Sequence, residues 1–300
     1  VEAKFKSSEH ETLRSIVKEF IAKNPGHDVE RACFGIAGPI QDRKCKATNL
    51  PWIVDADLIE KEANIPHVSL INDLEANAFG VNSLEDEEFA VLNEGKKQKG
   101  NAALISAGTG LGEAGLFWDG KKYCPFACEG GHCTFAPEDD LEVQLWQYLR
   151  KTYDHVSFER VLSGPGLYHI YRFLIDEGIE KEEESVKKAM ETTDPSRVIS
   201  EMGMQDASDS CVRALEIFIS IYGSEAGNLA LKMLAVGGVY IGGGIAPKIL
   251  DKLARGKWMK RFIQKGRFAP LLENIPVKVI LNENTALLGA AYYAQENSGT

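Results

Sequence analysis

The chain has 300 residues, which is enough for two domains of ordinary size. Its net charge of -10 argues against a nucleic-acid partner, because neutralising a phosphate backbone requires clustered Lys and Arg side chains. No run approaches the ~20 apolar residues that a membrane span needs. We therefore expect a cytoplasmic enzyme with neither a nucleic-acid nor a membrane partner.

The cysteines raise the question of a metal site. Cys124, Cys128 and Cys133 lie close together with His132 among them. Their C-x3-C-x4-C spacing lacks the paired C-x2-C knuckles that are typical of structural zinc. The sequence therefore favours reduced thiols and predicts no protein-bound metal.

The first part of the chain predicts helices and strands in alternation. The expected elements are a helix at Glu11–Asn24, a strand at Arg31–Ile36 that runs into Ala37-Gly38-Pro39, a helix at Asp55–Ala63, a strand at His67–Ile71 and a helix at Leu74–Gly80. This alternation indicates a mostly parallel α/β sheet, and such sheets bind ligands at the carboxyl ends of their strands.

The rest of the chain predicts a second α/β region after the polar segment Ser83–Glu88. Its expected elements are a strand at Asn101–Ser106, a hairpin of Ala114–Trp118 and Lys121–Tyr123 closed by Asp119-Gly120, helices at Leu141–Tyr153, Gly164–Glu177 and Ala207–Leu234, a strand at Val236–Ile241, a helix ending at Arg255, a strand at Val277–Leu281 and a helix at Thr285–Gln295.

Asn72 and Asp73 stand where a strand meets a helix. A carboxylate at a strand end is suited to take a proton from an attacking hydroxyl, as an aspartate does in other kinases. Asp and Asn are equally the preferred caps of a helix N-terminus. On local grounds alone the capping role is favoured.

Two glycine-rich segments follow strands. In Gly108-Thr109-Gly110-Leu111-Gly112, glycines let backbone N–H groups approach an oxyanion, and Thr109 adds a hydroxyl donor. No Gly-Lys-Ser/Thr follows, so this is not a P-loop. Gly242-Gly243-Gly244 precedes a predicted helix, whose N-terminus favours an anion or a polar nucleotide group. Each segment is also compatible with a simple turn.

Glu129-Gly130-Gly131-His132, together with the more distant Glu159, provides carboxylates and an imidazole. These groups suit a sugar pocket, because hydroxyls need charged acceptors and an orienting donor. Taken singly, each is more often a surface glutamate or a core histidine.

The order of these segments along the chain decides between the readings. The set closely resembles the bacterial glucokinase family, in the actin-like, sugar-kinase/Hsp70 ATPase superfamily. The segments that carry the resemblance are Ala37-Gly38-Pro39, Thr48-Asn49-Leu50-Pro51-Trp52, Ile71-Asn72-Asp73, Ala107–Gly112, Glu129–His132, Glu159–Leu167 and Gly242–Pro247.

The resemblance implies two RNase H-like α/β domains that flank a central cleft. We expect residues 1–82 plus 285–300 to form the small domain and residues 83–284 the large one. The implied activity is ATP-dependent phosphorylation of glucose at the 6-hydroxyl, at the entry to glycolysis, with Mg²⁺ as cofactor. A homodimer is also expected from the family.

The resemblance also assigns roles to individual residues. Asp73 resembles the family's general base. The residues that resemble sugar ligands are Asn49, Asn72, Asp73, Glu129, His132 and Glu159. The residues that resemble phosphate and adenosine ligands are Gly108, Thr109, Gly110 and Gly112, and Gly242, Gly243 and Gly244.

The family's first strand and its Asp-x-Gly-Gly-Thr phosphate loop have no counterpart in the sequence. We therefore expect the given chain to be the greater part of a longer protein. A kinase for another hexose or an N-acetylhexosamine, or a non-catalytic sugar-sensing relative, remains the alternative.

Overall fold

The computed structural model describes residues 1–26, 28–48 and 50–296. The chain divides into two compact units, and we describe each by itself. The small unit comprises Val1–Glu85, Cys124–Ala127 and Asn284–Thr300, and the large unit comprises Asp86–Tyr123 and Cys128–Glu283. Among the described residues, no helix combines the length and the apolar character that crossing a membrane requires.

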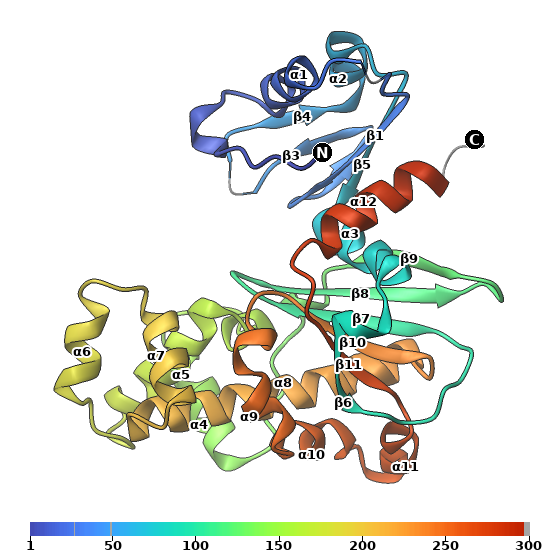
Figure 1. Cartoon of the computed structure of the whole chain (residues 1–300). Coiled ribbons are helices and arrows are strands. Elements are labelled where there is room, and N and C mark those ends of the chain that lie inside the picture. Colours follow the sequence, from blue (N-terminus) through green and yellow to red (C-terminus); the bar gives the residue numbers. More distant parts are fainter. Residues whose placement is uncertain (27, 49, 297–300) are drawn as a thin grey trace. The chain divides into compact units, whose positions relative to one another are not determined.

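The small unit contains a parallel strand pair with helices packed against it (Figure 1). Its elements are α1 (Leu13–Lys23), β1 (Arg31–Ile36), β2 (Ile40–Gln41), β3 (Lys44–Lys46), β4 (Ile53–Asp55), α2 (Ala56–Ala63), β5 (His67–Asn72), α3 (Asp73–Gly80) and α12 (Thr285–Glu296). β1 and β5 are parallel, with Ile36 beside Asn72, so both strands end at the same edge. The meander β2-β3-β4 was not predicted from the sequence.

Local sequence signals explain where the small-unit helices begin. Thr12 accepts a hydrogen bond from the Ser15 N–H, and Asp55 accepts one from the Leu58 N–H, so each residue caps the helix that follows it. These caps place the starts of α1 and α2 within two residues of the prediction. Asn64 ends α2 in the left-handed conformation.

Two glycines let α3 and α12 approach closely. A side chain on Gly80 would lie 2.1 Å from the Thr285 carbonyl oxygen, and one on Gly289 would lie 1.8 Å from the Ala76 carbonyl oxygen. Neither position has room for a Cβ atom. The backbones of the two helices are therefore in direct contact along the second half of α3.

The large unit is built on a six-stranded sheet in the order β6-β11-β10-β7-β8-β9, although Cys124–Ala127 of the last strand are grouped with the small unit. The strands are β6 (Phe89–Asn93), β7 (Ala102–Ala107), β8 (Leu111–Trp118), β9 (Tyr123–Cys128), β10 (Gly238–Gly242) and β11 (Val277–Ile280). β7, β10 and β11 are parallel, whereas β6 and β8 pair antiparallel to their neighbours. The large unit therefore has a mixed sheet, whereas the parallel pairing expected for the first part of the chain is found between β1 and β5 of the small unit.

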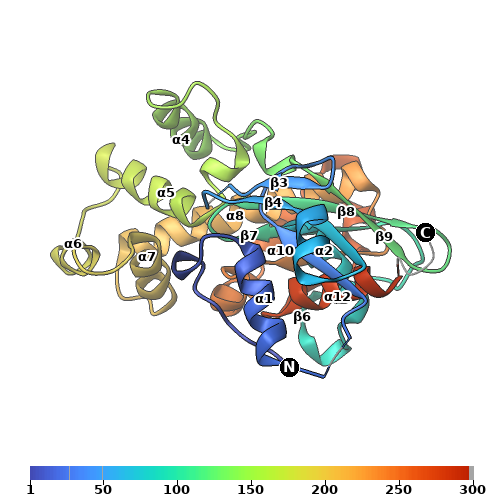
Figure 2. The ribbon, with the colours of Figure 1, turned by 90° about the horizontal axis from the view of Figure 1, so that it is seen from above.

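Helices make up most of the remaining large unit, and α5, α6 and α7 lie together in both views (Figures 1 and 2). The helices are α4 (Asp140–Arg150), α5 (Gly164–Asp176), α6 (Glu184–Met190), α7 (Pro195–Met204), α8 (Asp209–Met233), α9 (Leu250–Ala254), α10 (Lys257–Ile263) and α11 (Ala269–Glu273). The sequence predicted α4, α5 and α8 but missed α6, α7, α10 and α11, whose short apolar patterns are weak signals.

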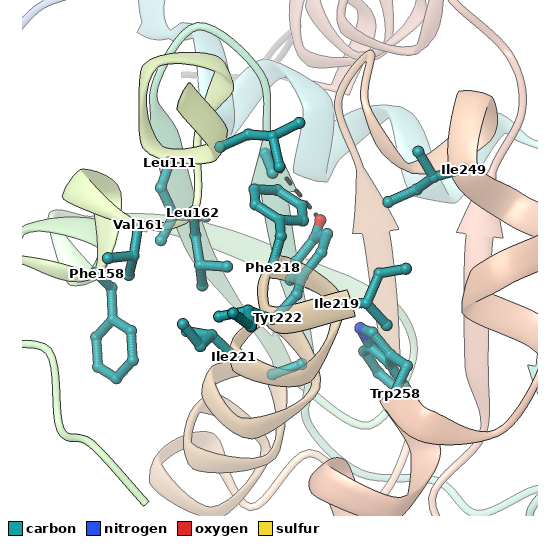
Figure 3. Packing of buried hydrophobic residues seen from close by; sticks show 14 of the residues in the cluster. Leu111, Phe158, Val161, Leu162, Phe218, Ile219, Ile221, Tyr222, Ile249 and Trp258 are labelled. Carbon is teal, nitrogen blue, oxygen red and sulfur yellow. Dashed lines mark hydrogen bonds between the residues drawn. The ribbon is translucent and has the colours of Figure 1, made fainter. Parts of the chain in front are cut away.

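The long helix α8, predicted from the sequence as Ala207–Leu234, forms the centre of the large-unit core. Phe218, Ile219, Ile221 and Tyr222 contribute to one continuous apolar cluster, which also includes Trp258 of α10 (Figure 3). At Gly223 and Gly227, one turn apart, added side chains would meet carbonyl oxygens of α10 at 2.2 and 2.4 Å. The two helices therefore pack backbone to backbone.

A buried arginine ties α10 to α8 and to the start of α4. The Arg261 guanidinium donates to Ser220 Oγ at 2.7 Å and pairs with Glu138, Asp139 and Glu142. The arginine side chain is only 10% exposed. Removing one member of such a buried network leaves uncompensated charge behind, which is costly.

We predict that Arg261→Met lowers the free energy of unfolding by about 3–5 kcal/mol, because the buried carboxylate of Glu142 loses its counterion. The matched control is Arg197→Met, whose ion pair with Glu201 is 69% exposed at the arginine and contributes about 0–1 kcal/mol. Urea unfolding followed by circular dichroism measures both. Equal effects of the two substitutions would contradict a special role for the buried network.

Candidate active site

The small unit places Asn72 and Asp73 together at the carboxyl edge of its parallel strands. Asn72 is the last residue of β5, and Asp73 is the first residue of α3. The Asn72 side-chain oxygen accepts the Leu74 N–H at 2.8 Å, so Asn72 is the helix cap. The capping role that the sequence left open between the two residues therefore belongs to Asn72.

The Asp73 carboxylate accepts a hydrogen bond at one of its two oxygens. One carboxylate oxygen, Oδ1, accepts the Leu74 N–H at 3.0 Å. No donor to Oδ2 is found among the described residues. Burial raises the pKa of the nearby Cys45 thiol, and the negative charge of Asp73 raises it further, so this neighbour stays a neutral thiol. The carboxylate is half-buried and fixed at one oxygen only.

Asp73 borders a cavity of about 530 Å³ within the small unit. Most of the lining is apolar, and it includes the aromatic rings of Phe34 and Trp52. The loop after β1 is fixed to the next segment, because both the N–H and the hydroxyl of Thr48 donate to the Ala37 carbonyl oxygen. The predicted sugar ligand Asn49 lies outside the described residues.

In the large unit, the glycine segment forms the tight hairpin between β7 and β8. Ser106 pairs with Gly112 and Ala107 with Leu111, so Gly108, Thr109 and Gly110 make the turn. The Gly108 N–H donates to the Gly110 carbonyl at 2.8 Å, which closes the turn. No acceptor for the N–H groups of Thr109 and Gly110 is found among the described residues. These two donors are the ones that an oxyanion could use.

The second glycine segment lies directly beside this hairpin. Gly242 ends β10 opposite Ser106 of the parallel strand β7. Gly243 has φ +84°, and a Cβ atom there would lie 2.3 Å from the Ala107 carbonyl oxygen. By contrast, nothing lies within 4 Å of the corresponding position on Gly244. The expected helix begins as a 3₁₀ turn at Ala246–Ile249 and continues as α9.

Helix α8 supports the glycine hairpin from the core side. The Ala107 N–H donates to the Tyr222 hydroxyl at 3.4 Å, which is a long hydrogen bond (Figure 3). Burial raises the pKa of the Tyr222 phenol, so this hydroxyl stays neutral. Tyr222 was not among the predicted site residues, because a tyrosine in an apolar helix normally indicates only core packing.

Glu129 and His132 stand on either end of a single 3₁₀ turn, Gly130–His132. Their side chains are 80% and 60% exposed, and the Glu129 Oε2 to His132 Nε2 distance is 4.0 Å. Gly131 lies so close to β8 that a Cβ atom would be 2.0 Å from the Leu111 carbonyl oxygen. The backbone of the turn therefore packs directly on β8, and the side chains of Glu129 and His132 lie next to each other on its exposed side.

Glu159 contacts the glycine hairpin itself. Its Oε2 accepts the Leu111 N–H at 3.0 Å, and a Cβ atom on Gly110 would lie 2.5 Å from the same oxygen. The segment before Glu159 is joined to the one after His132, because the Phe158 N–H donates to the Cys133 carbonyl and the Phe135 N–H to the Val156 carbonyl. The proposed sugar and phosphate residues of the large unit thus form one connected structure.

The sequence profile of the glucokinase family matches residues 1–297. This chain belongs to the glucokinase family. The expected family and the expected enzyme class, a hexose kinase, are thereby confirmed.

Individual relatives agree with this assignment. A glucokinase of Nostoc sp. is 42% identical, over 98% of this chain and 90% of the relative. A crystal structure of glucokinase from an Antarctic psychrotroph superposes with a TM-score of 0.86 at 30% identity, covering 98% of this chain and 88% of that one.

A more distant structure shares the fold. It is a glucokinase of the ROK family from Streptomyces griseus, solved in complex with glucose and AMPPNP. Its TM-score is 0.61 at 21% identity, and the match covers 95% of this chain and 89% of that one. At this identity the likeness shows the fold alone. The expected actin-like α/β fold is confirmed by these structural matches.

We predict that Gly243→Ala lowers the free energy of unfolding by about 1–3 kcal/mol, because the residue has a positive φ and faces the Ala107 carbonyl oxygen. Gly244→Ala is the matched control, since it has open space and no positive φ. The control should show no loss or a gain of up to about 1 kcal/mol. Thermal unfolding of both variants measures this, and an equal response would refute the close approach of the two segments.

Proposed function

We propose that this protein transfers the γ-phosphoryl group of ATP to the 6-hydroxyl of glucose. The observation that carries the proposal is Asp73 at the carboxyl end of β5, fixed at one oxygen by the Leu74 N–H. Membership of the glucokinase family supports the reaction class.

In this mechanism Asp73 is the general base. Its Oδ2 accepts the proton of the sugar hydroxyl as the oxygen attacks phosphorus, which removes the cost of forming a positively charged oxygen. The hydrogen bond to Oδ1 holds the carboxylate in one orientation, so little rotational freedom is lost when the substrate binds. Asn72 uses its side-chain oxygen for capping, which leaves its amide N–H groups to donate to a sugar hydroxyl.

Glu129, His132 and Glu159 hold the remaining sugar hydroxyls. The exposed side chains of Glu129 and His132 are adjacent, so they can bind neighbouring hydroxyls of one ring. Glu159 has one oxygen engaged by the Leu111 N–H and a second that can accept from a hydroxyl. We assign Asn49 to the same pocket on the family resemblance alone.

The two glycine segments suit ATP. The N–H groups of Thr109 and Gly110, with the Thr109 hydroxyl, can donate to phosphate oxygens, and Gly108 and Gly112 keep the turn narrow. The absence of side chains at Gly242, Gly243 and Gly244 lets a nucleoside approach the backbone. The Streptomyces griseus structure contains glucose and AMPPNP, an ATP analogue, and this supports the assignment of both substrates.

We expect ATP to bind with Mg²⁺, which would neutralise phosphate charge. In kinases this ion is held by one or two carboxylates together with phosphate oxygens, so no dedicated protein cage is required. No group of three or more candidate metal ligands is found in the described part of the chain. We therefore assign no residue as a Mg²⁺ ligand, and the roles above do not depend on one.

We predict that Asp73→Asn lowers kcat by about 10²–10⁴-fold, because the amide cannot accept the proton. Glucose binding, measured by isothermal titration calorimetry, should persist because the amide keeps the shape and polarity of the side chain. Asp57→Asn serves as the control, since Asp57 is an acidic residue of the same unit that is 63% exposed. If Asp73→Asn turned over glucose as fast as the wild type, the assignment of Asp73 as the general base would be wrong.

A sugar panel tests the substrate. With magnesium-ATP, we expect glucose to have a higher kcat/KM than mannose, galactose, fructose or N-acetylmannosamine, because Glu129, His132 and Glu159 are suited to the hydroxyls of a neutral hexose. Equal or better turnover of N-acetylmannosamine would refute the glucose assignment and favour the alternative of an N-acetylhexosamine kinase. Binding of sugar without turnover of any sugar would favour a sensing protein.

Three further features stay predictions from the family: a role in glycolysis, a cytoplasmic location and assembly as a homodimer. Sedimentation velocity at micromolar concentration would measure the assembly directly.

A further inference from the structure

A buried glutamate lies directly beneath the Glu129–His132 turn. Glu113, on β8, is 1% exposed, and a Cβ atom on Gly130 would lie 1.9 Å from its Oε2. Its other oxygen, Oε1, has no hydrogen-bond donor among the described residues. The carboxyl group therefore supports the backbone of the turn, and it has no role in the mechanism above.

A second buried glutamate faces it from α8. Glu225 is 0% exposed and accepts hydrogen bonds from Asn228 Nδ2 at 2.8 Å and from Lys232 Nζ at 3.0 Å. Both of these donors serve Glu225 rather than Glu113. The lysine side chain is 47% exposed, so it brings one positive charge to the edge of a site that contains two carboxyl groups.

Burial raises the pKa of Glu113 to about 8, and the negative charge of Glu225 and a hydrogen bond to it raise the pKa further, whereas Lys232 opposes the shift. Two carboxyl groups in contact cannot both ionise without strong repulsion, so the pair retains one proton. A protonated carboxyl can donate to the other one, which makes the pair a neutral and rigid support at neutral pH.

We propose that Glu113 is a positioning residue for the sugar site, and that its buried carboxyl group, which faces Glu225 and lies directly beneath Gly130, holds the turn where Glu129 and His132 can bind the sugar. This inference rests on the proposed function, which assigns the sugar to Glu129 and His132. Loss of the shared proton places two negative charges beneath a turn that has no space to move inward, so the turn shifts and the sugar binds less well.

Other titratable groups lie near Glu113 and Glu225, and their effects on the pH profile must be distinguished from that of the glutamate pair. Tyr222 and Lys232 face it from α8. The Cys128 thiol at the end of β9 donates to the Glu113 backbone carbonyl at 3.4 Å, and Cys133 follows the turn. Burial raises the pKa of the Cys128 thiol and of the Tyr222 phenol, so both groups remain neutral at neutral pH.

The test is the glucose KM of the full chain as a function of pH. Between pH 7 and about 9.5 we expect the wild-type KM for glucose to rise by about tenfold, equivalent to about 1.4 kcal/mol of lost binding free energy. The KM for ATP should change far less. In Glu113→Gln the side chain cannot ionise, so its glucose KM should stay near the neutral-pH wild-type value across the same range.

Glu225→Gln gives a second and opposite signature. Without the second carboxylate the pKa of Glu113 falls, so the rise of glucose KM should begin at a lower pH than in the wild type. A Cys128→Ser, Cys133→Ser double variant should keep the wild-type profile, which would exclude the thiols. A flat wild-type profile, or a rise of equal size in Glu113→Gln, would overturn the proposal.

Unfolding provides a readout that does not depend on activity. A carboxyl whose pKa is raised in the folded state keeps its proton above the ordinary value of 4.5, while the unfolded chain loses it. Wild-type stability should therefore fall relative to Glu113→Gln as pH rises from about 5 to 8 and then level off. A constant difference would count against the shared proton.

The Glu129→Gln variant distinguishes the proposed sugar-binding role of the Glu129–His132 turn from the proposed positioning role of Glu113. If this variant raises glucose KM and the wild-type profile is flat with pH, only the role of Glu113 fails. If Glu129→Gln leaves glucose KM unchanged, the sugar assignment of the turn fails, and the inference fails with it.

Discussion

The large unit depends on one close approach, between the ends of the parallel strands β7 and β10. Because these strands run in the same direction as neighbours, their glycine segments meet at one edge, and the Ala107 carbonyl oxygen lies where a side chain on Gly243 would be. The same residue, Ala107, donates its N–H to Tyr222 of the buried helix α8. The position of the turn is therefore set by the sheet on one side and by the core on the other.

Helix α8 extends this control to the second part of the site. Three residues on this helix, Tyr222, Glu225 and Lys232, face the glycine hairpin or the buried carboxyl group behind the Glu129–His132 turn. Helix α8 can hold both the glycine hairpin and the buried carboxyl group in fixed positions only if the helix does not rotate about its axis. Its backbone contacts with α10 at Gly223 and Gly227 and the salt bridges of Arg261 oppose such a rotation.

Much of this structure could be predicted from local sequence, for definite physical reasons. Capping residues, apolar periodicity and glycine turns fix the starts of α1, α2 and α3 and the location of the glycine turn after β7, because these signals act within a few residues. The antiparallel pairing of β6 with β11 could not be predicted, since these two strands lie far apart in the sequence. The buried pair of Glu113 and Glu225 left only a weak signal, a single acidic residue in each of two apolar stretches. Their proximity arises from the packing of α8 on the neighbouring strands β7 and β10 of the same sheet.

In the proposed function, the position of the Glu159 carboxylate couples the binding of the sugar to the binding of the nucleotide. One of its oxygens is bound to the backbone of the glycine hairpin. If the other binds the sugar as proposed, then a sugar that draws the carboxylate toward itself also changes the hairpin on which the phosphates rest. The two substrates are then linked, and by reciprocity glucose must change the affinity for nucleotide by the same factor by which nucleotide changes the affinity for glucose.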